Sequence, residues 1–322
     1  MIGLKMKKLL FLINLMFASF AFGQFGAPSY EEIITTEIIP EYSVWEKETQ
    51  RVLVHTKIQE GFSYYWRNGG ESGVPFDIKA KLPEGVELVD IVWGAPKYKI
   101  FFGQKTFAYV GGSWHLLTLK KSADMQGDIK LVLNNNFQVC NDQNCFAPRS
   151  LSFEQGLKIG SEESNSTFNE QLKKASSYLP TEQANVDAKV LKTDSGFELE
   201  IAKPANAKEV FFFNDSANLE AFDQKWVEKD GRLKAALGYS EFAEDKEEKL
   251  TGTLLVKTED GQQAYIIDFS KNKGKVVASK TMDQVGEVLD SGEEKPGFFK
   301  TILLMFVGGL LLNLMLVHHH LS

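Results

Sequence analysis

The sequence predicts an all-β protein of two β-sandwich domains, with an N-terminal signal peptide before them and a C-terminal transmembrane helix after them. Short runs of strand-forming residues recur between residues 33 and 159 and again between 187 and 269. Gly-, Pro-, Asn- and Asp-rich turns separate these runs at short spacing, and no long helical period lies between them. Many short strands without helical crossovers favour sandwiches over a βαβ sheet.

The composition is that of a globular protein with room for one or two cores. Of 322 residues, 43% are hydrophobic and 25% are charged, which argues against a disordered chain. Lys+Arg number 36 against 43 Asp+Glu, a net charge of -7, and this acidic balance argues against nucleic acid as a partner. Two cysteines cannot hold a disulfide-rich scaffold together or complete a four-ligand zinc site alone. No cofactor and no metal site are predicted.

Residues 1–24 are predicted to be a cleavable signal peptide. Three lysines precede an apolar run over residues 9–22, and small residues at its end offer a cut close to Gln24. A short membrane anchor is the alternative, which the shortness of the apolar run disfavours. Export matters because a cysteine pair outside the cytosol can form a disulfide and keep it.

The predicted domains follow the signal. Residues 25–160 form the first β-sandwich domain, which contains both cysteines. Residues 161–186 are rich in Ser, Glu, Asn and Gln and are interpreted as a linker with one short helix over residues 168–178. Residues 187–270 form the second β-sandwich domain, which has neither Cys nor His and therefore no obvious chemistry.

The C-terminal part is predicted to reach a membrane. Residues 271–297 are polar and are interpreted as a tether. A nearly unbroken apolar run of 20 residues begins at Phe298 and ends at Val317, long enough to cross a hydrocarbon core of about 30 Å as a helix. A buried core helix is a weak alternative because no polar face is visible. Residues 318–322 include three histidines, interpreted as an incidental tail because no partner ligands lie nearby.

The two cysteines flank a loop that has the composition of a tight hairpin. An apolar segment ends at Val139, four polar turn formers separate Cys140 from Cys145, and a second apolar segment begins at Phe146. A hairpin brings its flanking residues together, so a disulfide is geometrically plausible. No Lys or His flanks the pair in sequence, and the CxxC spacing is absent.

The shortness of this loop helps to choose between roles. Closing it with a disulfide contributes only about 2 kcal/mol in the chain-entropy model. A bond at a hairpin tip is, in contrast, well placed to be reached by an incoming thiolate. A redox-active pair is favoured, while a structural disulfide and an unpaired or metal-binding pair remain alternatives.

Several blocks of sequence occur in one order along nearly the whole mature chain. They are residues 61–75, residues 82–86, residues 91–93 with Pro96, Phe102 with Gly103, residues 137–140 with Cys145 and Pro148, and residues 298–315. In this order they resemble the periplasmic N-terminal part of the DsbD family of thiol:disulfide interchange proteins. These proteins are also described as protein-disulfide reductases or cytochrome c biogenesis proteins.

The resemblance implies immunoglobulin-like sandwiches and a Cys pair that shuttles electrons. In the family, a membrane domain passes reducing equivalents from cytoplasmic thioredoxin to a thioredoxin-like domain, which reduces the N-terminal pair. That pair then reduces periplasmic disulfide isomerases and cytochrome c maturation thioredoxins. The implied partners are therefore periplasmic thioredoxin-like proteins and a reductant domain absent from these residues. The implied location is the periplasm, with anchoring to the inner membrane through residues 298–317.

The resemblance also implies roles for individual side chains. Cys140 and Cys145 match the reactive pair, and Cys145 is expected to be the one that partners attack. Phe101 and Phe102 fall where the family has an aromatic cap that shields the disulfide, with core packing as the alternative. Weaker candidates for the border of the site, with core packing favoured for the aromatic residues, are Tyr64, Tyr65, Trp66 and Pro148.

The sequence departs from the family after Met315, where members usually continue with Pro-Cys and further helices. We therefore expect a chain truncated or split within the first membrane helix. The predicted function is thiol–disulfide exchange that relays reducing equivalents to exported proteins, as one part of a protein-disulfide reductase. A non-catalytic membrane-tethered binding module and an inactive truncated fragment with a structural disulfide are the alternatives.

Overall fold

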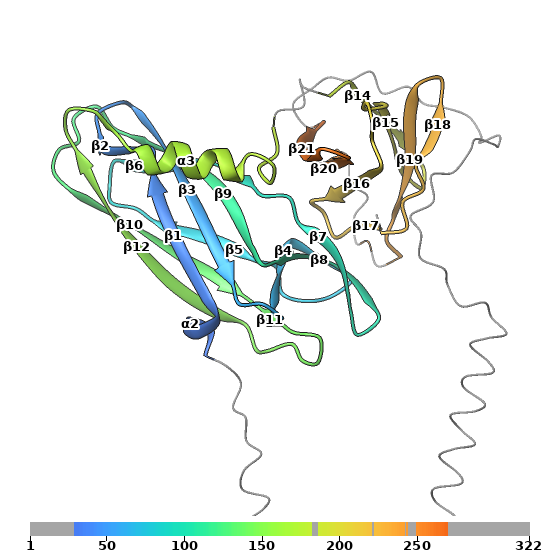
Figure 1. Ribbon diagram of the computed structural model, residues 1–322, viewed down its shortest axis with the longest axis horizontal. Coiled ribbons are helices and arrows are strands. Elements are labelled where there is room, and N and C mark those ends of the chain that lie inside the picture. Colours follow the sequence, from blue (N-terminus) through green and yellow to red (C-terminus); the bar gives the residue numbers. More distant parts are fainter. Residues whose placement is uncertain (1–28, 182–185, 221, 242, 244–248, 270–322) are drawn as a thin grey trace, which may run out of the picture.

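The computed structural model describes residues 29–181, 186–220, 222–241, 243 and 249–269 (Figure 1). The predicted signal peptide, tether and transmembrane helix lie outside the described residues. Within the described part of the chain, no helix combines the length and the apolar character that crossing a bilayer requires.

The first domain is a sandwich whose strands form three sheets. The first sheet has the order β1 (Ile34–Pro40), β3 (Thr49–Ile58), β9 (Gly112–Lys121) and β6 (Val86–Trp93). The second has the order β13 (Glu163–Ser164), β2 (Tyr42–Trp45), β12 (Arg149–Ile159), β10 (Ile129–Phe137) and β5 (Asp77–Lys81). The third, which we call the cysteine sheet, has the order β11 (Val139–Cys140), β4 (Ser63–Gly70), β8 (Gln104–Val110) and β7 (Lys97–Phe101).

Alternation along the strands sets the core of this domain. In β3, Val52 and Val54 enter the sandwich core, and Leu53 between them points to the other face. Successive side chains of a strand alternate between faces, so an uninterrupted apolar run requires cover on both sides. Pairing between β3 and β9 is antiparallel and sets Val52 opposite Leu117.

Helix α3 (Ser166–Ala175) covers the outer face of the first sheet (Figure 1). The side chain of Asn165 caps its N-terminus by accepting a hydrogen bond from the backbone N–H of Thr167 at 3.1 Å, which satisfies one of the free donors at a helix start. Its buried residue Phe168 packs in one cluster with Leu53. The helix expected in the linker is therefore part of the packing of the first domain.

The second unit is built from two smaller sheets and has its own core. One sheet has the order β14 (Ala188–Thr193), β15 (Gly196–Ala202), β19 (Arg232–Tyr239) and β17 (Leu219–Glu220), with β18 (Val227–Lys229) also paired to β19. The other has the order β16 (Glu209–Asn214), β20 (Thr251–Thr258) and β21 (Gly261–Asp268). Leu199, Leu233 and Leu254 are fully buried between them.

The two units are joined by direct packing as well as by the chain. Phe213, Leu255 and Ala264 of the second unit belong to the core cluster of the first domain. Thr181, just after α3, exchanges backbone hydrogen bonds with the second unit, donating to Ala264 at 2.9 Å and accepting from Ile266 at 2.7 Å. Because the apolar core is continuous across the boundary, the second unit packs directly against the first.

Candidate functional site

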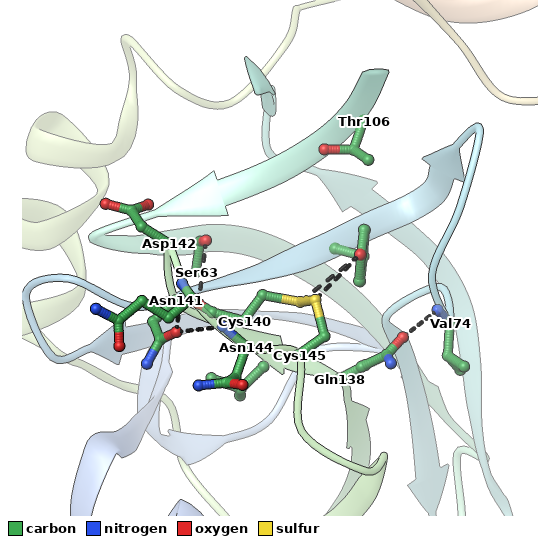
Figure 2. The surroundings of a disulfide bond; sticks show 12 residues. Ser63, Val74, Thr106, Gln138, Cys140, Asn141, Asp142, Asn144 and Cys145 are labelled. Atoms are coloured by element: carbon green, nitrogen blue, oxygen red, sulfur yellow. Dashed lines mark hydrogen bonds between the residues drawn. A yellow bond between two sulfur atoms is a disulfide. The ribbon is translucent and has the colours of Figure 1, made fainter. Parts of the chain in front are cut away.

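Cys140 and Cys145 form a disulfide at one end of the cysteine sheet (Figure 2). Their Cα atoms lie 4.1 Å apart, and the two residues face each other as an antiparallel bridge. Cys140 belongs to β11, where it pairs with Ser63 of β4. Within the described residues no cluster of three or more His, Cys, Asp or Glu side chains offers a metal site.

The loop between the cysteines is a hairpin held by one asparagine. The side-chain oxygen of Asn141 accepts hydrogen bonds from the backbone N–H groups of Gln143 at 2.9 Å and Asn144 at 2.7 Å. The backbone N–H of Asn141 donates to the backbone carbonyl of Asn144 at 2.9 Å. Asn side chains support such turns because they replace a backbone acceptor. The polar loop composition therefore produces the turn that brings the sulfur atoms together.

The two cysteines differ in their access to solvent. Cys140 is fully buried, whereas Cys145 is an exposed residue. Cys140 belongs to a small apolar cluster with Tyr65, Phe101 and Ala108. A thiolate from another protein can reach the pair more directly from the Cys145 side, since exchange requires contact with a sulfur atom.

Tyr65 is the tyrosine that touches the disulfide. Its hydroxyl oxygen lies 3.6 Å from Sγ of Cys140 and 3.7 Å from Sγ of Cys145, and because a disulfide carries no hydrogen, the hydroxyl is the donor. Tyr64 and Trp66, named from sequence, alternate to the other face of β4 and are fully buried in the sandwich core. The alternation of strand residues was visible in sequence, but which of the three rings faces the sulfur atoms depends on the pairing of β4 with β11.

Phe101 and Phe102 occupy different environments at the tip of the β7–β8 hairpin. Phe101 is 4% exposed, and its ring packs edge-on against Tyr65 with centroids 5.9 Å apart. Phe102 is 64% exposed. With φ angles of 50° and 82°, Phe102 and Gly103 form the two-residue turn, and such a left-handed backbone is unusual for a bulky residue. Phe101 therefore covers the cysteine cluster, while Phe102 extends from its rim.

Lys99 connects the strand that carries Phe101 to the loop between the cysteines. Its Nζ atom lies 3.3 Å from Oδ1 of Asp142 and 3.5 Å from Oγ of Ser63. The same atom lies 4.5 Å from the centroid of the Phe101 ring. No lysine is near the pair in sequence, and this one arrives from β7 through sheet pairing that local sequence does not encode.

The segment after Cys145 is anchored by the short helix α2 (Tyr30–Ile33). The hydroxyl of Tyr30 donates to the carbonyl of Ala147 at 2.8 Å and accepts from the N–H of Val139 at 3.1 Å. Burial raises the pKa of Tyr30 above its usual value, which keeps the hydroxyl protonated as the donor. Pro148 follows in this segment as an exposed residue. Sequence analysis did not single out Tyr30.

Comparison with known families agrees with this geometry. Residues 31–156 match the family model described as thiol:disulfide interchange protein DsbD, N-terminal. These residues are a DsbD N-terminal domain. Both cysteines, the Phe101 hairpin and Tyr65 lie within the matched DsbD segment. The family resemblance and the all-β immunoglobulin-like fold expected for this domain are confirmed.

Solved structures extend the comparison in fold. The N-terminal periplasmic domain of ScsB from Proteus mirabilis is 14% identical, with a TM-score of 0.53, over 75% of this chain and 96% of that one. The DsbD N-terminal domain of Neisseria meningitidis in its reduced form is 17% identical, with a TM-score of 0.24, over 39% of this chain and 90% of that one. No curated protein matches the sequence. At 14% identity the likeness to ScsB concerns the fold alone.

Proposed function

We propose that the Cys140–Cys145 pair relays reducing equivalents to exported thioredoxin-like proteins, such as disulfide isomerases and cytochrome c maturation thioredoxins. The observation that carries this proposal is the asymmetry of the pair, with one exposed cysteine and one buried beneath Tyr65 and Phe101. A purely structural disulfide does not require one of its two cysteines to be exposed to solvent. Membership of residues 31–156 in the DsbD N-terminal family supports thiol–disulfide exchange as the chemistry.

The exchange balances as a two-electron transfer. In the reduced protein, the Cys145 thiolate attacks one sulfur of the partner's disulfide, forming a mixed disulfide and releasing the other partner sulfur as a thiolate. The Cys140 thiolate then attacks Sγ of Cys145, which forms the Cys140–Cys145 bond and releases the second partner thiolate. Each released thiolate takes up a proton. The partner gains two electrons and two protons, and a dithiol donor in another protein domain restores the pair by the reverse steps.

The surroundings of the pair suit docking of a partner protein. The rim of the site carries the exposed apolar residues Phe102, Val74 and Val110. Val74 is held at this rim by its backbone N–H, which donates to the side chain of Gln138 at 2.6 Å (Figure 2). Apolar side chains gathered beside a reactive bond favour a protein partner over a small solute. Displacement of Phe101 by that partner would also uncover the buried Cys140.

The proposed setting is an oxidising compartment outside the cytosol. Its support is the signal-like segment 1–24 and the apolar run 298–317, which suggests anchoring to the inner membrane. Fractionation of cells that express the full chain, with and without residues 1–24, tests this setting. Retention of the complete chain in the soluble cytosolic fraction would contradict it.

Two single-cysteine variants test the exchange itself. In the Cys140→Ser variant no second thiol of the chain can attack a mixed disulfide at Cys145. The variant is therefore expected to accumulate a mixed disulfide with an oxidised thioredoxin-like protein. Cys145→Ser, the matched control, keeps only the buried thiol and is expected to accumulate little. Cross-linking by Cys145→Ser alone would reverse the assignment of the attacked cysteine, and cross-linking by neither would refute the relay.

The reduction potential separates a relay from a structural disulfide. Equilibration of the wild-type chain with glutathione buffers measures it, and a relay requires a value less negative than about −300 mV. A more negative value would favour the alternative, a non-catalytic membrane-tethered binding module with a structural bond. In that case the double Ser variant keeps partner binding and loses only about 2 kcal/mol of stability.

A further inference from the structure

The cysteine sheet is a single layer with the disulfide on one face and the second unit on the other. Register places Tyr65 opposite Ala108, and both belong to the cluster around Cys140. The alternate residues of the same strands, Trp66 and Phe107, point to the opposite face and are fully buried. Figure 1 shows the second unit beside β7 and β8.

Phe107 is the centre of the contact with the second unit. Its ring centroid lies 5.0 Å from that of Phe222, 5.1 Å from Phe213 and 6.1 Å from Phe211. Phe211 and Phe213 are in β16, and their own centroids are 4.6 Å apart. Aromatic pairs at these separations add stability beyond the apolar area that they bury. We call these four residues, together with Trp66 and Tyr98, the interdomain aromatic cluster.

Tyr98 brings the cap strand β7 into this cluster. Its ring centroid lies 5.8 Å from that of Phe211 and 6.4 Å from that of Phe222. Register pairs Tyr98 with Phe107, so the two rings share the face that the second unit covers. Tyr98 precedes Phe101 by three residues on the same strand, and alternation turns Phe101 to the disulfide face.

Polar contacts tie the same hairpin to the second unit. Lys105 lies beside Gln104, the residue paired with Phe101, and its Nζ atom is 2.5 Å from Oδ2 of Asp223. On β4, the side-chain amide of Asn68 donates to the carbonyl of Asn214 at 2.8 Å. The cysteine sheet is thus held by the second unit both at the hairpin and at the end of β4.

We propose that the second unit buttresses the cap, so that Phe211 and Phe222 are positioning residues for the exchange reaction. β7 is the last strand of its sheet and pairs only with β8 among the described strands. Without a neighbour on its outer edge, β7 depends on the interdomain aromatic cluster to keep Tyr98, and hence Phe101, in place. Moving Phe101 off the disulfide requires β7 to loosen these contacts. The inference deepens the proposed exchange function and rests on it.

The test measures how fast a small dithiol reaches the disulfide of the full chain. Phe211→Ala and Phe222→Ala are expected to raise the second-order rate constant for reduction by dithiothreitol about two- to tenfold, the factor that corresponds to about 0.5–1.5 kcal/mol. Phe211→Leu and Phe222→Leu restore apolar volume and are expected to return the rate towards the wild-type value. Val190→Ala, which trims the second unit's own core on β14, is the matched control and leaves the rate unchanged.

A variant on the first-domain side of the contact separates loss of the contact from misfolding of the second unit. Tyr98 is 37% exposed, so Tyr98→Ala removes the cap's share of the contact with little risk to folding. It is expected to accelerate reduction to the same extent and to speed amide exchange in residues 97–101 but not in residues 77–81. Wild-type rates in Tyr98→Ala and in the two Phe→Ala variants, or equal acceleration by Val190→Ala, would overturn the proposal.

This outcome is independent of the test of function. Dithiothreitol reports access to the sulfur atoms whether or not a protein partner exists. A strongly negative reduction potential combined with faster reduction in the variants would refute the relay and leave the buttress standing. A relay potential with unchanged reduction rates would do the opposite.

Discussion

Consecutive residues of β4 meet two different environments on the two faces of the cysteine sheet. On one face Tyr65 lies against the sulfur atoms, in a cluster that buries Cys140 and leaves Cys145 exposed. On the other face Trp66 is fully buried, 6.2 Å from Phe213 of the second unit between ring centroids. Both faces use aromatic rings, and what separates them is access: one face can open to solvent, and the other is closed by a second layer of protein.

Removing the ring on the closed face is expected to have the largest effect on stability. Trp66→Ala deletes a fully buried side chain in contact with both units and should lower the free energy of unfolding by about 3–5 kcal/mol, as large core truncations do. Urea titration followed by circular dichroism measures the loss. A loss of unfolding free energy below about 1 kcal/mol would mean that the surroundings of Trp66 are less tightly packed than its full burial indicates.

Acid is expected to act on the buried core and not on the disulfide. Burial lowers the pKa of His115 to about 3, with a smaller contribution from Arg67, while the unfolded chain has a value near 6.5. Between these values the unfolded state binds the proton and the folded state does not. Stability from this residue is therefore complete above about pH 6.5 and decreases as pH falls, by up to about 1.4 kcal/mol per pH unit.

Thermal or urea unfolding between pH 7 and pH 4 tests this dependence. Burial also lowers the pKa of His55, to about 4, so the variant His55→Gln removes the contribution of that residue from the measured pH dependence. A pH-independent stability in that variant would show that His115 becomes protonated within the folded core.

On the open face, two neighbouring phenylalanines test which side chain limits access to the disulfide. Phe101→Ala uncovers the cluster around Cys140 and should raise the rate of reduction by dithiothreitol about tenfold or more, because an aromatic cap of this size contributes about 1.5 kcal/mol or more when buried. Phe102→Ala, the matched control, removes an exposed ring and should leave that rate unchanged. The assay follows the free thiols that appear with time. Equal effects of the two substitutions would mean that the tip of the hairpin opens as a whole.

Lys99 is expected to have the smallest effect. Lys99→Met removes the ion pair with Asp142 and the contact with the Phe101 ring, which are partly exposed and together are worth about 1 kcal/mol. Reduction by dithiothreitol should become about three- to fivefold faster. Added salt should accelerate the wild-type reaction towards the variant's rate, since salt screens the ion pair. A wild-type rate that does not respond to salt would exclude the ion pair as a restraint on the cap.

Much of the site follows from residues that are close in the chain. The four polar residues between Cys140 and Cys145 form their turn through the Asn141 side chain, so the hairpin could be predicted from composition. The burial of Phe101 and the exposure of Phe102 could not be predicted, because they depend on which residue enters the two-residue turn. Lys99 and Asp142 are 43 residues apart, and only the order of strands in the cysteine sheet brings them together.

The sequence by itself determined the all-β character of the described chain, the hairpin that closes the disulfide and the family of the first domain. The first two properties depend on alternation and turn chemistry, which act between near neighbours, and the family is indicated by blocks of sequence that follow one order along the chain. The tertiary structure alone decided that Tyr65 and not Tyr64 meets the sulfur atoms, and that the second unit covers the back of the cysteine sheet. Those outcomes depend on strand register and on contacts between distant segments, because burial is a property of the whole packed chain and no local pattern encodes it.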